Sequence, residues 1–304
     1  MHKKLMGTAF EFVLHHLNQN DAEQILELGV QEVERIESLL TEFKSNSITS
    51  QLNANAGKEW VVVGEEVFNL LKRCHGISHL SKGSFDITVG PLKSIYKFKN
   101  TNFQMPSEEE INRALGLVGY TSIELDESSY SARLQKKNMR ISFAAIGKGY
   151  AADRVKKLWL THGIQSAVIS ASGDMCTIGK SGNGKKWNVG IADPQNKERT
   201  LCRIPLFNSS VATSGNYEQF FEYQGVRYSH NINPLTGYPV KGIKSVSVVS
   251  PAAELSDALA TAITIKGVES GLDFVNQLPE THCLIVDDLN QVHTSKSIQI
   301  EYEN

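Results

Sequence analysis

The order in which strand-like and helix-like patterns follow one another limits the fold of this chain more than any other feature of its sequence. Runs of apolar and β-branched residues predict strands over residues 5–14, 139–146, 166–170, 187–192, 246–250, 282–286 and 296–302. Apolar residues at helical spacing predict helices over residues 22–43, 65–80, 107–117, the segment after Gly149, and 254–266. The segments do not alternate as strict βαβ units, which predicts an α+β fold with largely antiparallel sheet.

Capping signals mark where two of these helices begin. Asn20 is followed three positions later by Glu23, the spacing of a capping box, and Ser107 is followed in the same way by Glu110. Gly163 is expected to end the helix that follows residue 149.

Composition excludes several classes of function. The chain has 304 residues, enough for one large domain or two lobes, and 40% of them are hydrophobic and 21% charged, as in soluble globular proteins. The net charge of -2, without a block of like charges, argues against a nucleic-acid-binding surface. The four cysteines are widely spaced, which argues against a zinc site or a disulfide framework. No repeat or low-complexity linker divides the chain, so we expect a single domain over residues 1–304.

The N-terminal segment bears on the cellular location. Its apolar run from Leu5 to Phe10 is short and Glu11 interrupts it, so no signal peptide is visible. No segment approaches the roughly 18 apolar residues of a membrane helix. The expected location is cytoplasmic, or extracytoplasmic if a leader has been removed.

The segment Gly147–Ala152, with the sequence GKGYAA, follows a predicted strand and opens a predicted helix. Backbone N–H groups at such a helix start attract phosphate. The segment also imitates the dinucleotide fingerprint G-x-G-x-x-A, with Asp174 roughly where a ribose-binding acid would lie. Glycines that simply allow a tight turn explain the pattern about equally well, and the parallel units of a dinucleotide-binding fold are missing.

Asp257 and Thr261 lie four residues apart in a predicted helix, so their side-chain oxygens share one face. A carboxylate and a hydroxyl together suit a hard cation such as Mg²⁺. Spacing alone favours a simpler interpretation, in which Asp257 complements the helix dipole and Thr261 packs in the core.

Three loop segments carry weaker signals. Residues 228–237 are rich in turn formers and contain His230, a candidate general base or phosphate ligand. Residues 83–92 are flanked by glycines that would let the backbone approach a ligand. Residues 212–217 place small hydroxyls before a glycine, a pattern that lines some anion sites. Taken alone, each segment is more often structural: an ordinary turn or bend, or, for His230, a histidine whose hydrogen bonds are satisfied.

Together and in this order, the segments resemble the ApbE family, the FAD:protein FMN transferases. The resemblance runs through Met6-Gly7-Thr8, residues 85–92, the GKGYAAD run, Ser172-Gly173-Asp174, residues 212–217, the His230 loop and the Asp257–Thr261 helix. It implies a compact two-lobed α+β fold with mixed, largely antiparallel sheets and flanking helices, and a flavin site between the lobes. It also implies FAD as substrate and Mg²⁺ as cofactor.

The resemblance also assigns individual positions. Those that match contacts to FAD are Met6, Phe43, Phe85, Asp86, Ile87, Ser142, Lys148 and Asn231. Those that match metal positions are Ala145 through its carbonyl, Asp257, Ala260 and Thr261. Phe43 stands where many members have a tyrosine, and it keeps the aromatic face without the hydroxyl.

The chain departs from the family pattern at several places. Ser142 replaces a common aspartate, Ala144-Ala145 replaces a glycine pair, and Ser172 replaces the first glycine of Gly-Gly-Asp. Asn216 replaces the aspartate of Gly-Asp-Tyr, and Asn233 that of Asp-Pro. The predicted metal-binding helix is intact, and how far the departures reduce transferase activity stays open.

The reaction that the resemblance implies is transfer of FMN from FAD to a protein. A Ser or Thr hydroxyl of an acceptor with an Asp-x-x-Ser/Thr-Gly-Ala-Ser/Thr pattern would attack the FMN phosphorus, and AMP would leave. Magnesium would stabilise the developing charge, and His230 or Asp257 would accept the proton. Two alternatives use the same site: hydrolysis of FAD to FMN and AMP, and FAD binding without turnover, which Ser142 and Asn216 favour.

Overall fold

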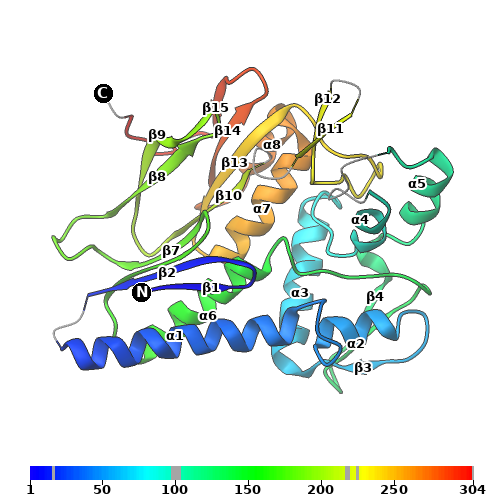
Figure 1. Cartoon of the computed structure of the whole chain (residues 1–304), viewed down its shortest axis with the longest axis horizontal. Coiled ribbons are helices and arrows are strands. Elements are labelled where there is room, and N and C mark those ends of the chain that lie inside the picture. The colour runs from blue at the N-terminus through cyan, green and yellow to red at the C-terminus, as the bar shows by residue number, and fades with distance from the viewer. Residues whose placement is uncertain (16–17, 97–103, 216–219, 224–225, 303–304) are drawn as a thin grey trace.

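A computed structural model describes residues 1–15, 18–96, 104–215, 220–223 and 226–302 of the chain (Figure 1). Its largest element is an eight-stranded sheet in the order β1-β2-β6-β7-β10-β13-β14-β15. The strands are β1 His2–Leu5, β2 Thr8–Leu14, β6 Ser166–Ala171, β7 Asp174–Gly179, β10 Ser210–Gly215, β13 Ile243–Ser250, β14 His282–Asp287 and β15 Val292–Thr294. Every neighbouring pair in this sheet is antiparallel, as the sequence predicts.

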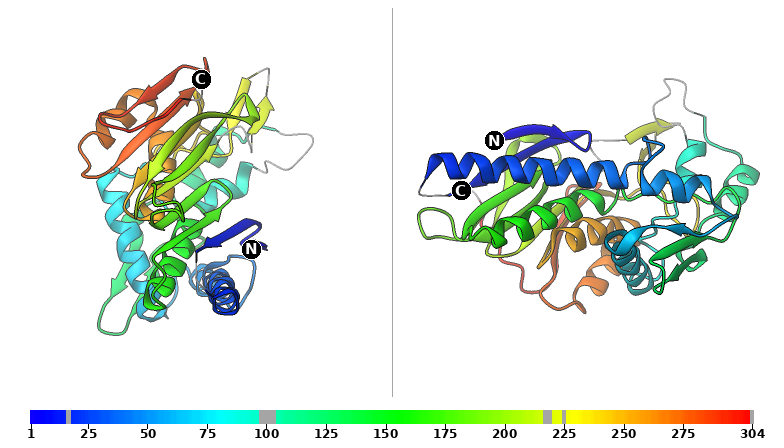
Figure 2. Two further views of the ribbon diagram at one scale, coloured as in Figure 1. Left: turned by 90° about the vertical axis from the view of Figure 1, so that its left-hand side faces the viewer. Right: turned by 90° about the horizontal axis from the view of Figure 1, so that it is seen from below.

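Three helices pack against the sheet and against one another: α1 Gln19–Leu40, α6 Gly147–Thr161 and α7 Ala253–Lys266. The longest, α1, runs along one side of the molecule (Figure 2). Trp159 of α6 is fully buried, and its Nε1 donates a hydrogen bond to the Ile25 carbonyl of α1 at 2.9 Å. A Cβ at Gly29 would come within 2.9 Å of the Trp159 ring. Glycine therefore allows α1 to cross α6 at close range.

Gly149 has a similar function between α6 and α7. A Cβ at this position would lie 2.2 Å from the Ala253 carbonyl oxygen. The first turns of the two helices can touch only because residue 149 has no side chain. The second glycine of the GKGYAA segment thus has a packing reason of its own, whatever the segment binds.

The opposite face of the sheet is covered by a two-stranded ribbon of β8 Trp187–Asp193 and β9 Asn196–Leu206. Apolar side chains of the ribbon, such as Ile191 and Ile204, form a buried cluster with Val211 of β10 and Leu284 of β14. The sheet is therefore buried on both faces over part of its area.

The remaining elements lie outside the large sheet, its covering ribbon and the three helices packed on it (Figure 1). The helices there are α2 Ile48–Ala54, α3 Gly64–Leu80, α4 Gly90–Tyr96, α5 Glu108–Leu115, the 3₁₀ turn Tyr120–Ser122 and α8 Val268–Val275. The strands are β3 Val61–Val62, β4 Ile123–Asp126 and β5 Ser131–Leu134, which form one small sheet, and the hairpin of β11 Phe220–Tyr223 and β12 Val226–Ser229. None of the helices in the described part of the chain is long and apolar enough to cross a membrane.

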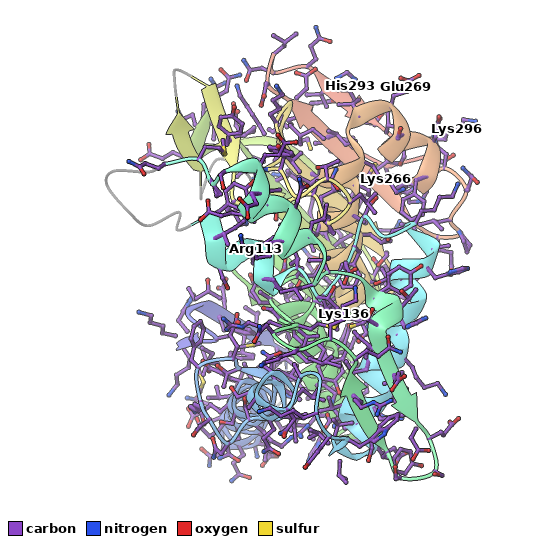
Figure 3. All side chains as sticks on the ribbon, turned by 90° about the vertical axis from the view of Figure 1, so that its right-hand side faces the viewer. Arg113, Lys136, Lys266, Glu269, His293 and Lys296 are labelled. Carbon is purple, nitrogen blue, oxygen red and sulfur yellow. The ribbon has the colours of Figure 1, made fainter. Side chains whose placement is uncertain are left out.

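Charged side chains cover the outer surface of this arrangement. Arg113, Lys266 and Lys296 lie on the face shown in Figure 3. Arg113 pairs with Glu109 one helical turn earlier, at 2.7 Å. Such exposed pairs contribute little to stability, and they keep the surface polar.

Several predicted boundaries agree with the structure. Residues 65–80 and 254–266 are helical within α3 and α7. The capping box of Ser107 and Glu110 is present at the start of α5, with both of its hydrogen bonds. Local pattern was sufficient at these places because capping and burial favour the same boundary.

Five of the predictions are wrong. Residues 5–14 form a hairpin, because Met6 and Gly7 adopt positive φ angles of 49° and 76° and turn the chain. The cap of α1 is Asn18 rather than Asn20, since its side chain accepts from the N–H groups of residues 20 and 21. Helix α1 ends at Leu40, so Phe43 lies beyond it and is 90% exposed. The segment 296–302 contains only one isolated bridge, at residue 301.

The fifth, the strand predicted over 139–146, is replaced by an extended loop. The side chain of Asn53 accepts from the Ile141 N–H at 2.8 Å and donates to its carbonyl at 3.0 Å. A single amide thus satisfies the backbone groups of Ile141 that a neighbouring strand would otherwise pair. The segment also forms an isolated parallel bridge between Arg140 and Val89.

Candidate active site

Two cavities adjoin where the chain enters α6. The first, which we call the polar cavity, has a volume of about 320 Å³ and is lined by Lys93, Ala144, Ala145, Lys148, Ser172, Thr213, Ser214, Gly215, His230, Asn231, Asp257 and Thr261. The second, the apolar cavity, has a volume of about 310 Å³ and is lined by Met6, Gly7, Glu37, Leu40, Thr41, Glu42, Phe43, Ser142, Phe143, Ala144, Gly147 and Lys148. Ala144 and Lys148 line both, so a long ligand could occupy the two cavities together.

Lys148 connects two carboxylates in the polar cavity. Its Nζ lies 2.6 Å from Oδ2 of Asp174 and 3.5 Å from Oδ2 of Asp257. The same Asp257 oxygen accepts from the Gly149 N–H at 3.3 Å. The first turn of α6, the start of β7 and the first half of α7 therefore meet at one charged group.

The charges in this cluster are not balanced. Burial raises the pKa of Asp174, and repulsion from Asp257 raises it further, while Lys148 opposes the shift. Burial would lower the pKa of Lys148, but Asp257 and Asp174 offset this and the pKa is raised. The single ammonium group of Lys148 thus compensates two poorly solvated carboxylates. A further positive charge would stabilise this cluster.

Asp257 and Thr261 share one face of α7, as their spacing in the sequence predicts. Asp257 and Thr261 both line the polar cavity, and Ala145, from the loop before α6, lines it beside them. Asp257 is 7% exposed, so its carboxylate faces the cavity from a largely buried position. Ala260, also proposed at the metal site, is buried in the main core and does not line either cavity.

The apolar cavity brings together residues from distant parts of the sequence. Met6 contributes from the β1–β2 turn, which is held to α1 by a hydrogen bond from the Met6 N–H to Glu37 Oε2 at 2.9 Å. Phe43 contributes from the chain beyond α1, and Ser142 donates to Glu42 Oε1 at 3.1 Å. These are three of the positions predicted to contact a flavin nucleotide.

Other predicted contacts lie behind the cavity walls. Phe85, Asp86 and Ile87 are buried and do not line either cavity. Asp86 accepts hydrogen bonds from the N–H and hydroxyl of Thr88 and from the Tyr120 N–H. Its carboxylate is engaged in holding this loop, whose Ile87 carbonyl in turn accepts from the Ser142 N–H at 2.8 Å.

Comparison with known proteins identifies the family of this chain. The sequence model of the ApbE family matches residues 6–285, nearly the whole chain and all the cavity-lining positions. The chain belongs to the ApbE family. Its members by sequence include the FAD:protein FMN transferase of Treponema pallidum, which is 30% identical over 86% of this chain and 76% of that protein. The FAD:protein FMN transferase of Escherichia coli strain K12 is 28% identical over 90% of this chain and 80% of that protein.

Solved ApbE structures have the same fold. The ApbE protein of Thermotoga maritima superimposes with a TM-score of 0.89 at 31% identity, covering 98% of this chain and 96% of that one. The flavin transferase ApbE of Vibrio cholerae gives a TM-score of 0.86 at 22% identity, covering 98% of this chain and 96% of that one, and supports the fold alone. The α+β architecture expected from the sequence is therefore confirmed.

The loop that contains His230 and Asn231 forms another wall of the polar cavity of this ApbE-family chain. Asn231 Nδ2 donates to Ser214 Oγ at 3.3 Å, which connects the loop to β10. The small hydroxyls singled out in residues 212–217 are thus present at the site. Asn216 itself lies outside the described residues.

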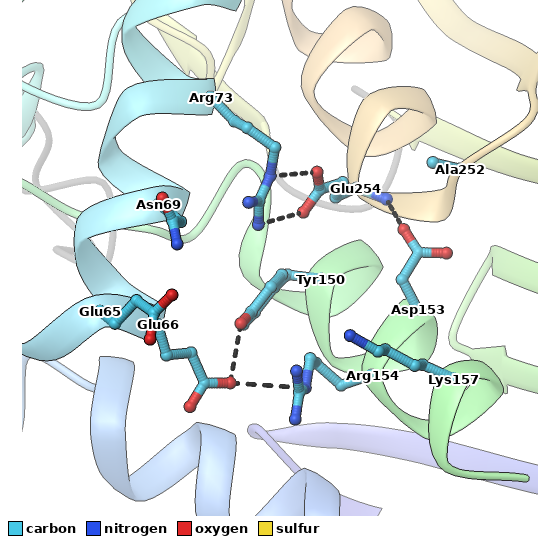
Figure 4. A pocket seen from close by; sticks show the side chains of 10 residues that line it. All are labelled: Glu65, Glu66, Asn69, Arg73, Tyr150, Asp153, Arg154, Lys157, Ala252 and Glu254. Atoms are coloured by element: carbon cyan, nitrogen blue, oxygen red, sulfur yellow. Dashed lines mark hydrogen bonds and ion pairs between the residues drawn. The ribbon is translucent and has the colours of Figure 1, made fainter. Parts of the chain in front are cut away.

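A third cavity of this ApbE-family chain lies elsewhere, between α3, α6 and the start of α7, with a volume of about 590 Å³ (Figure 4). Several of its polar groups pair with one another: Arg73 with Glu254 at 3.0 Å, and Glu66 with Tyr150 at 2.8 Å and with Arg154 at 3.4 Å. We interpret these paired groups as contacts that hold α3, α6 and α7 together, and we do not interpret this cavity as the reaction site.

Sequence reasoning missed three charged residues that line the cavities, Glu37, Glu42 and Lys93. Lys93 directly follows the segment 83–92, which the sequence marked only for its glycines. The signal was available, since Lys93 is the one charged residue in the α4 sequence GPLKSIY. A lysine on a short helix usually points to solvent, which is why the pattern alone gave no reason to choose it.

Proposed function

We propose that this chain transfers FMN from FAD to a Ser or Thr hydroxyl of an acceptor protein, releases AMP, and requires Mg²⁺ for the transfer. The observation that supports this most strongly is the pair of adjoining cavities, one polar and one apolar, in a chain whose relatives are named FAD:protein FMN transferases. A dinucleotide could place its flavin ring in one cavity and its diphosphate in the other.

The residues of the polar cavity fit a magnesium ion. The donors would be the Asp257 carboxylate, the Thr261 hydroxyl and the Ala145 carbonyl, which are the hard oxygen ligands that Mg²⁺ prefers. The described residues contain no group of three or more His, Cys, Asp or Glu side chains that would enclose a metal ion. This agrees with a metal that takes its remaining ligands from water and phosphate, and when bound it would neutralise charge on the diphosphate.

Side chains of the protein would position the reacting groups, accept the proton and cover the flavin. Lys148 holds Asp174 and Asp257 in place through its two ion pairs. His230, from the opposite loop, would accept the proton of the acceptor hydroxyl as that oxygen bonds to the FMN phosphorus and the bond to the AMP phosphate breaks. In the apolar cavity, the exposed ring of Phe43 and the side chain of Met6 would cover the flavin.

The experiment that tests this function supplies the purified chain with FAD, Mg²⁺ and an acceptor protein that carries the pattern Asp-x-x-Ser/Thr-Gly-Ala-Ser/Thr. We expect the intact mass of the acceptor to increase by one covalently bound FMN, with an equal amount of AMP released, and neither change after chelation of the metal. AMP without a labelled acceptor would indicate hydrolysis of FAD instead. FAD binding without AMP would indicate a carrier.

A further inference from the structure

Lys93 is an unusual residue for its position. Helix α4 packs Leu92 and Tyr96 into a buried apolar cluster with Ile111 of α5 and Ile232, yet Lys93 lies between them in the sequence and lines the polar cavity. It comes from the α4 side of the cavity, whereas the proposed cation ligands Asp257 and Thr261 come from α7.

The charge of Lys93 has little compensation within the protein. In the described part of the chain, no carboxylate forms an ion pair with its ammonium group, in contrast to Lys148, which is engaged with two aspartates. Burial lowers the pKa of Lys93, and only the more distant charge of Glu42 opposes that shift. A half-buried cation without a close partner costs free energy unless a ligand supplies the anion.

The arrangement of charges indicates what that anion is. Lys148, the other lysine that lines the cavity, is already engaged with Asp174 and Asp257. The diphosphate of a dinucleotide brings further negative charge on its non-bridging oxygens, which Lys148 alone would not balance. Lys93 lines the same cavity and supplies a second ammonium group for the diphosphate.

We propose that Lys93 binds the diphosphate of FAD through its non-bridging oxygens, on the side away from the Asp257–Thr261 face. The inference rests on the function proposed above and adds a residue to it. The ligand class that Lys93 recognises is the diphosphate group, so FAD and ADP depend on it and riboflavin, which has no phosphate, does not. A lysine ammonium is a mobile point charge and suits a phosphate that shifts as the bond to AMP breaks.

The test compares Lys93→Gln, Lys93→Arg and the parent chain by direct titration with FAD, ADP and riboflavin. A lost hydrogen bond between charged groups predicts about 10- to 100-fold weaker binding of FAD and ADP to Lys93→Gln, with partial recovery in Lys93→Arg. Riboflavin affinity should be unchanged. Lys296→Gln, a change on the outer surface (Figure 3), is the matched control and should behave like the parent in all three titrations.

A second variant guards against a folding defect. Lys93→Met removes the charge and keeps much of the length of the side chain, so it should unfold at the same temperature as the parent or a higher one and still bind FAD weakly. Equal FAD affinity in Lys93→Gln and the parent overturns the inference. An unchanged FAD affinity with a raised KM for the acceptor also overturns it, and assigns Lys93 to an acid of the acceptor protein. Failure of the parent chain to bind FAD would refute the proposed function itself.

Discussion

Asp257 is the residue on which the chemistry of the polar cavity depends. Its carboxylate already has two neighbours, the Lys148 ammonium at 3.5 Å and the Gly149 N–H at 3.3 Å, and both share one oxygen, Oδ2. Oδ1, the other carboxylate oxygen, takes part in neither of these contacts, and it is the oxygen that we expect to bind a cation. Asp257 therefore combines a structural contact with a proposed ligand.

Asp257→Ala is expected to abolish Mg²⁺-dependent transfer and to leave the fold intact, because Lys148 keeps its closer partner Asp174 at 2.6 Å. Turnover of FAD and thermal unfolding, measured side by side, check this. If Asp257 only complemented the dipole of α7, its removal would cost about 0.3–1 kcal/mol of stability and leave turnover unchanged. Asp273→Ala on α8 is the control substitution.

His230 is expected to act on the proton rather than on binding. His230→Ala should leave FAD affinity within a few-fold and slow FMN transfer by about 10²–10⁴-fold, the usual effect of losing a general base. Rates measured from pH 6 to 9 with saturating FAD check this. Affinity and rate falling together would indicate a phosphate ligand. A mutant that transfers FMN at the parent's rate would move the proton acceptor to Asp257.

Phe43 is not part of the core, since its side chain is 90% exposed. Phe43→Ala should therefore change the free energy of unfolding by less than about 0.5 kcal/mol. FAD affinity should fall, because about 1 kcal/mol of aromatic contact is lost together with burial of the ring. Titrations with riboflavin and with ADP show which part of FAD Phe43 contacts. Riboflavin should bind more weakly to the variant than to the parent, and ADP should bind to both equally well. Leu289→Ala, at a similarly exposed residue, should affect neither ligand.

At the scale of elements, helix α7 depends on a residue of α6 for its beginning. Its own N-cap position is Ala252, which provides no side-chain hydrogen bond. Asp153 of α6 replaces it, accepting from the N–H groups of Ala253 at 3.0 Å and Glu254 at 2.8 Å. The helix that carries the proposed metal ligands is thus held at its start by Asp153, which lines the third cavity (Figure 4).

Asp153→Ala is expected to destabilise the protein by about 1–2 kcal/mol, the typical loss for a helix cap. The rate of FMN transfer should decline more than the affinity for FAD. The start of α7 would be free to move relative to Lys148, whereas the apolar cavity would keep its shape. Urea unfolding and separate measurement of KM and kcat check both effects. Asp153→Asn keeps one of the two acceptor oxygens and should recover part of the loss. Equal defects in the two variants would contradict a capping function.

Elements with self-contained signals could be predicted from the sequence, and those completed by remote partners could not. The α5 capping box needs only Ser107 and Glu110, which are three residues apart. The extended loop at Ile141 depends on Asn53, and the exposure of Phe43 depends on where α1 ends. No local pattern contains that information.

The same distinction holds for the site. Helical spacing put Asp257 and Thr261 on one face, and the resemblance to the ApbE family then assigned that face to a metal, because spacing alone favoured a structural role. Lys93 was not identified, because only the tertiary packing of α4 turns it toward the polar cavity. The individual site assignments, the extent of the domain and the cytoplasmic location remain predictions.

At the scale of the whole molecule, three helices are joined by one network of charges. Arg35 of α1 lies 2.7 Å from Glu66 of α3, and Arg154 of α6 lies 3.0 Å from Glu32 of α1. Tyr150 of α6 donates to Glu66 at 2.8 Å. The network connects α1 to α3 and α6, which line the third cavity, so its protonation bears on the stability of the entire fold.

Glu66 gives this network a defined dependence on pH. The hydrogen bonds from Arg35 lower the pKa of Glu66 from its ordinary value of 4.5 to about 2, against the opposing effect of burial and with further help from Tyr150. Between these values the unfolded chain binds more protons than the native one. The stabilisation from Glu66 is therefore present above pH 4.5 and is lost as the pH falls toward about 2.

Glu66→Gln should remove this part of the pH dependence. We expect the variant to be less stable than the parent at pH 7, and the difference between them to shrink steadily as the pH falls from about 4.5 toward 2. Urea unfolding midpoints at pH 7, 4 and 3 measure it. Glu127→Gln, at an exposed carboxylate paired with Lys72, is the matched control and should follow the parent at every pH. A difference between Glu66→Gln and the parent that stays constant from pH 7 to 3 would mean that the stabilisation comes from packing or neutral hydrogen bonds rather than from the charge of Glu66.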